Sequence, residues 1–311
     1  MTKMTLKEFV APPAAYFDDM SGYPYDEKGR ACCEAKAAPY YAVFEQNRSE
    51  RRRALSAMRD ELAAGPVLVS TFNWGFRRLV ENWVASCDRH GIDCRSFTLL
   101  FPMDEAADEF ARELGFQTYF DGTSYGRLPK EACKAFGDDD FRMALFAKIA
   151  ATQDMLRVGA DVLRQDVDIV WLGDPRAYLR GRMARRSLDF QFMDDGPNPI
   201  YRPLHFNSGF VYIANTAASR FAWDLVFSSY ARVIHYGSEQ RVINIVMSYL
   251  ADRGLRCERL PEMEFVNGHV IGEALGGDEK MPEASTVIHA SWTPNLDEKL
   301  KRLKRLGLWY I

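Results

Sequence analysis

Strand-like and helix-like segments alternate along this chain from residue 66 to residue 165. Short apolar runs predict buried strands, and longer stretches whose apolar residues recur every three or four positions predict amphipathic helices. Alternation of this kind predicts an α/β fold whose mostly parallel sheet is flanked by helices. The expected strands are 66–72, 96–101, 117–120 and 160–165, and the expected helices include 105–114 and 139–158.

Two carboxylates follow the fourth of these strands, in the run VLRQDVDIVWLGDP. Asp166 and Asp168 are two residues apart and would repel each other unless a positive group held them. Mg²⁺ and Mn²⁺ prefer carboxylate oxygens as ligands, and a bound cation can in turn grip a diphosphate. Ligands of such sheets bind at the carboxyl ends of strands, so the segments 70–73 and 166–168 are expected to face one cleft. The pair therefore predicts a metal-dependent enzyme that acts on a nucleotide-linked substrate.

The second half of the chain is less regular. Segment 187–196 ends in another acid pair, and HFNSGFVYIANT (205–216) predicts a strand bounded by turns. Helices are expected near 216–230 and 238–251. The segment STVIHASW (285–292) predicts a strand that runs into a loop, and a helix with one basic face follows it.

The first 65 residues differ from the remainder in composition. Four prolines between residues 11 and 40 predict loops, and a single helix is expected before Gly65–Pro66 ends it. We therefore predict an N-terminal extension with one helix, 1–65, and a main domain, 66–311.

Composition narrows the class of protein. A formal net charge of −3 argues against a nucleic-acid partner, since such proteins carry a basic excess. None of the six cysteines has the CxxC spacing of a zinc site, so we expect free thiols. No segment reaches the roughly 20 apolar residues of a membrane span, and the N-terminus shows no signal-peptide pattern. The sequence as it stands predicts a cytoplasmic protein, and a Golgi or ER lumen protein only if a native anchor has been removed.

Four stretches, in this order, resemble nucleotide-diphospho-sugar transferases of the GT-A fold, and most closely retaining glycosyltransferase family 77. The stretches are TFNWGFRRLVENWVAS, a lysine-containing helix followed by GADVLRQDVDIVWLGDP, FNSGFVYI, and HASW followed by KLKRLKRLGLWY. The resemblance covers about residues 66–311. It implies a Rossmann-like mixed sheet, Mn²⁺ or Mg²⁺ as cofactor, and transfer of a sugar from a UDP-sugar to an acceptor hydroxyl. It also implies retention at the anomeric carbon, and the acceptor can be a glycan, a protein or a small molecule.

Residue chemistry and the resemblance together assign candidate roles. The expected metal ligands are Asp166, Asp168 and His289. The expected donor-binding residues are Thr71, Phe72, Asn73, Lys148, Asp166 and Lys299. The residues expected to bind the sugar hydroxyls of the substrate are Asp194, Asp195, Asn207, Ser208 and Gly209. The expected catalytic residues are Glu239 and Gln240, which the resemblance places near the anomeric carbon, although the family usually has Asp-Gln there. If the reaction uses a nucleophile, Glu239 is the best-placed carboxylate, with Gln240 as a positioning group.

Each role has a structural alternative. His289 can be a core-edge histidine, Lys148 can extend along an apolar helix face, and Ser238 can cap a helix whose first turn holds Glu239. The turn-forming residues near Asn207 can simply form turns. Two other functions are open. One is a phosphohydrolase of the haloacid dehalogenase type, in which the first aspartate of DxD is the nucleophile, and the other is a non-catalytic binder of nucleotide sugars or glycans.

Overall fold

The computed structural model describes residues 10–22, 25–122, 125, 128–131, 139–276 and 281–311. These residues form a mixed sheet of seven strands in the order β3-β2-β1-β4-β7-β6-β8. Neighbouring strands are parallel, except that β7 is antiparallel to both β4 and β6. The prediction of a mostly parallel α/β sheet flanked by helices is confirmed. The strands are β1 Val67–Phe72, β2 Thr98–Pro102, β3 Gln117–Thr118, β4 Val162–Gln165, β6 Phe190–Asp194, β7 Phe206–Ile213 and β8 Cys257–Arg259.

A smaller sheet joins the C-terminal part of the chain to the acid pair. Its described strands are β5 Ile169–Trp171, β10 Val287–His289 and β9 Phe265–Val266, with β10 in the centre. The sequence predicts a strand that runs into a loop within 285–292, as found for β10, and it predicts no strand at 169–171. The small sheet decides which residues of the late segment reach the acid pair.

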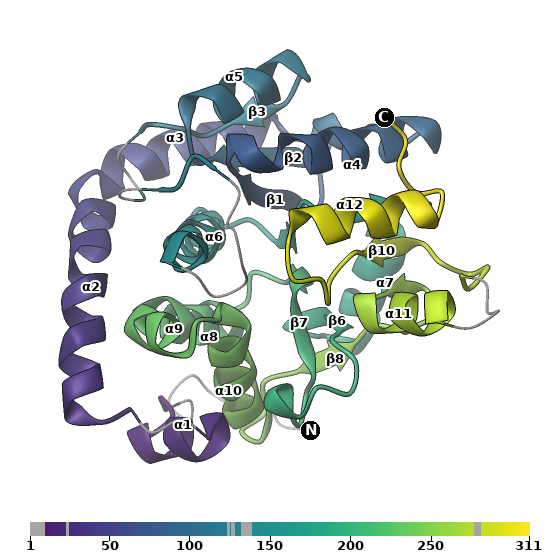
Figure 1. Cartoon of the computed structure of the whole chain (residues 1–311). Helices are drawn as coiled ribbons and strands as arrows, with labels where there is room; N and C mark the ends of the chain where they lie inside the picture. Colours follow the sequence, from purple (N-terminus) through teal and green to yellow (C-terminus); the bar gives the residue numbers. More distant parts are fainter. Residues whose placement is uncertain (1–9, 23–24, 123–124, 126–127, 132–138, 277–280) are drawn as a thin grey trace.

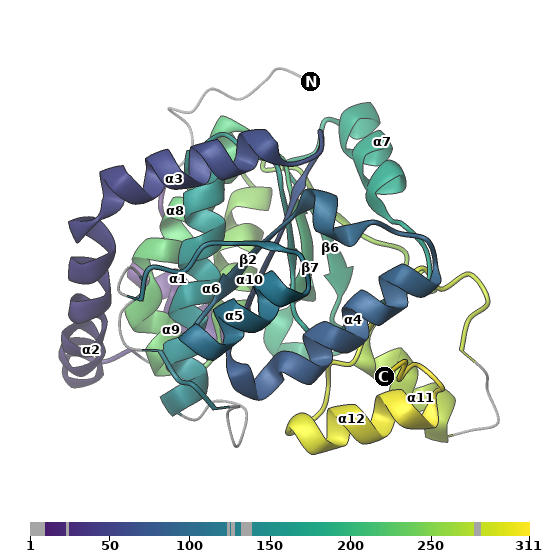
Figure 2. The ribbon, with the colours of Figure 1, turned by 90° about the horizontal axis from the view of Figure 1, so that it is seen from above.

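Helices cover both faces of the large sheet (Figures 1 and 2). Val67 and Val69 of β1 belong to the hydrophobic cluster that also contains residues of α6, α8, α9 and α10, whereas Leu68 belongs to the cluster that contains residues of α4, α5 and α7. This alternation follows from the two-residue period of a strand. The helices are α1 Ala14–Ser21, α2 Glu27–Gln46, α3 Arg48–Glu61, α4 Arg77–Arg89, α5 Glu105–Glu113, α6 Asp139–Arg157, α7 Arg176–Arg186, α8 Ala217–Ser228, α9 Tyr230–Tyr236, α10 Glu239–Ala251, α11 Gly268–Gly276 and α12 Leu296–Arg305, with short 3₁₀ turns at η2 Trp74–Phe76, η3 Cys94–Phe97 and η4 Pro199–Tyr201.

The prediction of loops between residues 11 and 40 is wrong, and the extension has three described helices rather than one. Helix α2 contains Pro39, and Cys32–Cys33 lies on this helix and not in a loop. Packing explains the difference. The rings of Tyr41 and Phe44 lie 5.3 and 4.8 Å from the ring of Phe227 on α8. These aromatic contacts, in which Phe44 is buried and the other two rings are half-buried, offset the cost of a proline inside a helix. The division at residue 65 stays a prediction.

The structure tests the predictions of free thiols and of no membrane span for the described residues only. The thiols of Cys32, Cys33, Cys87, Cys94 and Cys257 are free, as expected, and Cys133 lies outside the described residues. In the part of the chain that the structure describes, every helix is too short or too polar to cross a bilayer. The cellular compartment stays a prediction.

Candidate functional site

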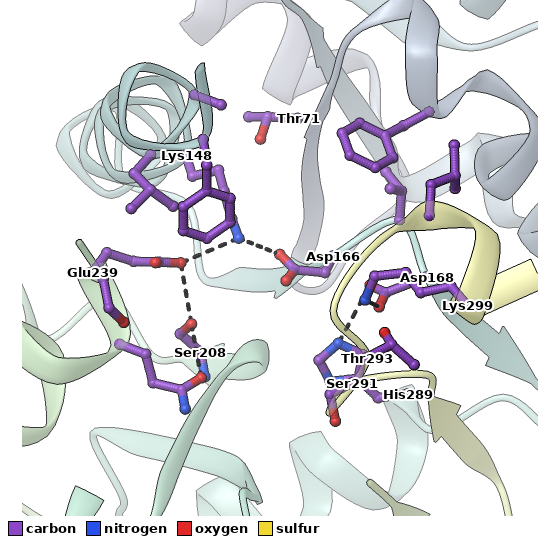
Figure 3. Close-up of a pocket in the computed structure, with 18 of the residues that line it drawn as sticks. Thr71, Lys148, Asp166, Asp168, Ser208, Glu239, His289, Ser291, Thr293 and Lys299 are labelled. Carbon is purple, nitrogen blue, oxygen red and sulfur yellow. Dashed lines mark hydrogen bonds and ion pairs between the residues drawn. The ribbon is translucent and has the colours of Figure 1, made fainter. Parts of the chain in front are cut away.

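A cleft of about 530 Å³ opens where β1 and β4 end. Its volume lies within the range of small-molecule sites. Segments far apart in sequence meet here, including α6, the start of α10 and the C-terminal segment (Figure 3). Of the residues singled out from the sequence, it is lined by Thr71, Phe72, Asn73, Lys148, Asp166, Asp168, Asp195, Asn207, Ser208, Glu239, Gln240, His289 and Lys299. Asp194 and Gly209 do not line it.

The register of the small sheet brings His289 to the acid pair. His289 pairs with Ile169, which directly follows Asp168. The next backbone N–H, of Ala290, donates to the Asp168 carbonyl at 2.9 Å. One ligand atom from each of Asp166, Asp168 and His289 lies within 4.8 Å of the other two. His289 and the acid pair, more than a hundred positions apart in sequence, therefore share one small volume.

Two lysines neutralise the acids. Lys148 Nζ lies 2.7 Å from Asp166 Oδ1, and Lys299 Nζ donates to Asp168 Oδ2 (Figure 3). Burial alone would raise the pKa of Asp168, but Lys299 and His289 outweigh it and hold that pKa well below its usual range. The positive groups that the acid pair required are thus present in the protein itself.

The three converging side chains suit a hard divalent cation. Two carboxylates and an imidazole form an oxygen and nitrogen set that Mn²⁺ and Mg²⁺ accept. Among the described residues, His289 Nδ1 is buried without a hydrogen-bond partner, while Nε2 lies 3.3 Å from Asp168 Oδ1. Nε2 therefore faces the acid pair. The residues present therefore fit a metal site.

Gly209 supports His289 from behind the cleft. A Cβ added to Gly209 would lie 2.2 Å from His289 Cε1, so only glycine allows the ring to take this position. The glycine lies in β7, where the register with β6 shifts between Phe192 and Met193. Such irregularities often re-aim side chains next to functional sites. Gly209 thus positions the imidazole instead of facing the cleft.

We expect Gly209→Ala to lower the free energy of unfolding by about 1–3 kcal/mol, because a methyl group would overpack the His289 ring. Displacement of the ring should also weaken Mn²⁺ binding. Urea unfolding and titration calorimetry with Mn²⁺ would measure both effects. The control is Gly272→Ala on α11, where an added Cβ meets no atom within 4 Å. Equal behaviour of the two variants would show that the ring does not depend on Gly209.

Glu239 lies buried at the start of α10, and three donors hold its Oε1. These are Lys148 Nζ at 3.1 Å, Arg164 Nη2 at 3.0 Å and Ser208 Oγ at 3.1 Å. Burial would raise the pKa of Glu239, but Lys148 and Arg164 outweigh it and lower the pKa to about 2. The neighbouring Gln240 Oε1 accepts from the Ser208 N–H at 2.9 Å. Glu239 is therefore a fixed, charged carboxylate at the wall of the cleft.

Sequence reasoning missed Arg164, which lies 2% exposed on β4. Its Nη1 donates to the Ser208 carbonyl at 2.6 Å, so it ties β4 to β7 as well as to α10. A guanidinium inside an apolar strand was the available signal, because a buried charge needs a partner.

Ser238 caps α10 as expected, because its side chain accepts a hydrogen bond from the Arg241 N–H.

The two acids at the end of β6, Asp194 within the strand and Asp195 directly after it, point in different directions. Asp195 lines the cleft and accepts from Asn207 Nδ2 at 2.7 Å, and burial raises its pKa to about 6. Asp194 instead pairs with Arg259 Nη1 at 2.5 Å, outside the cleft. Successive residues of a strand face opposite sides, so only one of the pair can reach a ligand in the cleft.

The end of β1 offers a different surface. Thr71 and Phe72 line the cleft, and Asn73 Nδ2 donates to the carbonyls of Pro129 and Glu131 at 3.0 and 2.6 Å. Asn73 therefore fastens a neighbouring loop segment to the strand end. The space beside Thr71 lies on the far side of Asp166 from Ser208 and Ser291 in Figure 3.

Known proteins share this sequence pattern. Residues 94–303 match the family of nucleotide-diphospho-sugar transferases. The β-arabinofuranosyltransferase RAY1 of Arabidopsis thaliana is 22% identical over 78% of this chain and 47% of its own length. Arabinosyltransferase RRA2 of the same plant is 25% identical over 79% of this chain and 60% of its own length. Its UDP-D-xylose:L-fucose alpha-1,3-D-xylosyltransferase 1 is 22% identical over 59% and 55%. This chain thus spans about half of the length of these curated relatives.

Two solved structures of glycosyltransferases resemble parts of this chain. The bifunctional enzyme WbbM has a TM-score of 0.47 at 10% identity, over 77% of this chain and 49% of its own. GlyE of Streptococcus pneumoniae has a TM-score of 0.44 at 14% identity, over 79% and 64%. The family match spans well over half of the sequence and contains the acid pair, Glu239 and His289. The chain therefore belongs to the nucleotide-diphospho-sugar transferase family.

Proposed function

We propose that this protein is a metal-dependent, retaining glycosyltransferase that moves a sugar from a UDP-sugar to an acceptor hydroxyl. The observation that carries the proposal is the convergence of Asp166, Asp168 and His289 with two lysines in one cleft. A diphosphate would bring several negative charges to this place, and the cleft supplies the matching cationic groups.

The relatives favour a pentose as the transferred sugar. Two of them are named arabinosyltransferases, and a third is named for UDP-D-xylose as donor and L-fucose as acceptor. We therefore propose a UDP-linked pentose as donor and a glycan or glycoside as acceptor. The nucleobase would lie at the end of β1, near Thr71 and Phe72.

Different residues of the cleft would bind the cation, the diphosphate and the sugar. Asp166, Asp168 and His289 would hold the cation, and the amines of Lys148 and Lys299 would then turn from the acids to the diphosphate oxygens. The chemistry that a bound cation supplies is Lewis-acid stabilisation of the departing nucleoside diphosphate. Asp195, Asn207 and Ser208 would orient the sugar hydroxyls.

Retention can arise from front-side departure and attack or from a covalent intermediate. The contacts favour the first route. Glu239 Oε1 already accepts from Lys148, Arg164 and Ser208, and a carboxylate so strongly neutralised is a poor nucleophile. We propose that Glu239 and Gln240 orient the donor near its anomeric carbon.

The two other functions have less support. A phosphohydrolase of the haloacid dehalogenase type usually carries its acid pair on the first strand of the core, whereas this pair follows β4. A non-catalytic binder would have no need for the three converging ligands of the metal site. Hydrolysis of a generic phosphate ester with Mg²⁺ would favour the phosphohydrolase instead.

We expect EDTA to abolish both UDP binding and the release of UDP from UDP-xylose or UDP-arabinose. The reason is that the acid pair and the diphosphate repel each other unless a cation lies between them. Calorimetry with UDP, in Mn²⁺ and in EDTA, would measure binding, and a coupled assay for free UDP would measure turnover. Near-ultraviolet circular dichroism serves as the control for folding. Equal affinity for UDP in both conditions would overturn the metal-dependent mechanism.

A further inference from the structure

Trp292 is a large apolar side chain that stays 45% exposed at the cleft. Among the described residues, few large apolar side chains are exposed to this degree, and Ile200 and Trp292 both line this cleft. A single exposed apolar residue is ordinary on a protein surface. Two at one ligand site give that site exposed apolar surface that a ligand can cover.

The indole of Trp292 is fixed in place. Its Nε1 donates to the Asp195 carbonyl at 2.8 Å, and its ring lies edge-on to His269, with centroids 5.3 Å apart. Arg302 donates to the Trp292 carbonyl at 3.3 Å. Because both the indole ring and the backbone carbonyl of Trp292 are held by hydrogen bonds, the side chain loses little further freedom when a ligand covers it, which favours binding.

The backbone of Trp292 is strained. Its φ is 57°, in the left-handed region, where a residue with a Cβ costs roughly 1–2 kcal/mol. Such conformations persist where the surrounding contacts hold them, commonly at binding sites. Nearly half of the side chain is exposed, so the strain does not serve to fill a core. The conformation presents the ring instead of burying it.

The ring lies at the sugar end of the cleft. Its Nε1 is hydrogen-bonded to the backbone carbonyl of Asp195, and the Asp195 carboxylate accepts from Asn207. Asp195 and Asn207 are both proposed to bind sugar hydroxyls. Figure 3 shows Ser291, the residue before Trp292, well away from Thr71, where the nucleobase would lie. An acceptor approaching the donor sugar would therefore pass the indole.

We propose that Trp292, together with Ile200, is the platform on which the ring of a sugar acceptor stacks. A sugar ring has a face of C–H groups and an edge of hydroxyls. The indole face can make dispersion contacts with the C–H face of the sugar, and the adjacent Asp195 and Asn207 can hydrogen-bond to its hydroxyls. The inference rests on the proposed transfer reaction and deepens it, because it selects a glycoside acceptor over a protein hydroxyl.

Steady-state kinetics with Mn²⁺, UDP-xylose or UDP-arabinose, and a panel of methyl glycosides would test the platform. Trp292→Gly removes the ring without adding backbone strain, since glycine adopts a positive φ freely. We expect it to raise the acceptor KM about three- to tenfold, and to raise it several times more than the donor KM. Trp292→Phe should restore most of the acceptor KM. The control, Met263→Ala, removes a 57% exposed side chain away from the cleft.

An acceptor KM within about twofold of the wild-type value would overturn the platform, and so would a larger rise in the donor KM. If the wild-type protein releases no UDP from any donor, the proposed transfer reaction fails. Saturation-transfer NMR with the methyl glycosides alone then tests the platform separately. Signals that the wild-type protein gives and Trp292→Gly loses would support it, and equal signals would overturn it.

Discussion

Asp168→Asn is expected to reduce transfer from the UDP-sugar by more than about a hundredfold while the protein stays folded. Loss of a residue that only orients a metal ligand costs about 10–100-fold in metal affinity or activity, and Asp168 is proposed to touch the ion itself. The structure strengthens the expectation, because Lys299 and His289 both contact this carboxylate. An asparagine keeps the shape of the side chain but removes the charge. Assays of UDP release in Mn²⁺ would measure the loss, and urea unfolding would report the fold.

The matched control is Asp174→Asn, which changes another aspartate of the same segment, after β5. Asp174 pairs with Arg176 at 2.7 Å on the surface, and pairs of this kind contribute at most about 1 kcal/mol. It lies outside the cleft, so transfer should stay near the wild-type rate. Near-normal activity of Asp168→Asn in Mn²⁺ would show that the metal site has been assigned to the wrong residues.

Much of the large sheet was predictable because local patterns specify its elements, although the edge strand β8 was not among the predicted strands. The predicted strand 66–72 is β1 Val67–Phe72, and the predicted helix 139–158 is α6 Asp139–Arg157. The apolar runs and helical periods of these segments carry the information without help from distant residues. The position of Asp166 and Asp168 at a strand end followed from the same patterns.

Contacts between distant segments could not be predicted in the same way. The meeting of His289 with Asp168 depends on the register of β5 and β10, which no local pattern encodes. The choice between Asp194 and Asp195 depends on which face of β6 meets the cleft. In the N-terminal segment, the tertiary packing of α2 overrides the local preference that Pro39 expresses.

Arg164 shows what closer attention to the sequence can recover. It is a charged residue within the short buried strand β4, and every such residue requires a partner inside the protein. The pattern therefore predicts that a carboxylate lies near, although it does not identify Glu239. The same reasoning applies to Arg51, whose side chain is fully buried within an arginine-rich helix.

Arg51 connects the N-terminal segment to the helix that carries Lys148. Its Nε lies 2.7 Å from Asp154 Oδ2 on α6, and its Nη2 donates to the Phe44 carbonyl at 2.8 Å. The guanidinium also lies 4.0 Å from the centroid of the Phe44 ring. Burial raises the pKa of Asp154 only to about 6, so the pair is charged at pH 8. Helices α3 and α6 are thereby joined by a buried ion pair.

Asp154→Leu should therefore lower the free energy of unfolding by about 3–5 kcal/mol at pH 8, because it leaves the Arg51 charge buried without its partner. Arg51→Met should cost a similar amount by leaving Asp154 unpaired. The double variant should recover much of the loss, since two apolar side chains of similar volume can replace a buried ion pair at little cost. Urea unfolding of the two single variants and the double variant gives the coupling energy directly. Strictly additive losses would show that the two groups stabilise the protein independently, and that the N-terminal segment is not held to α6 through this pair.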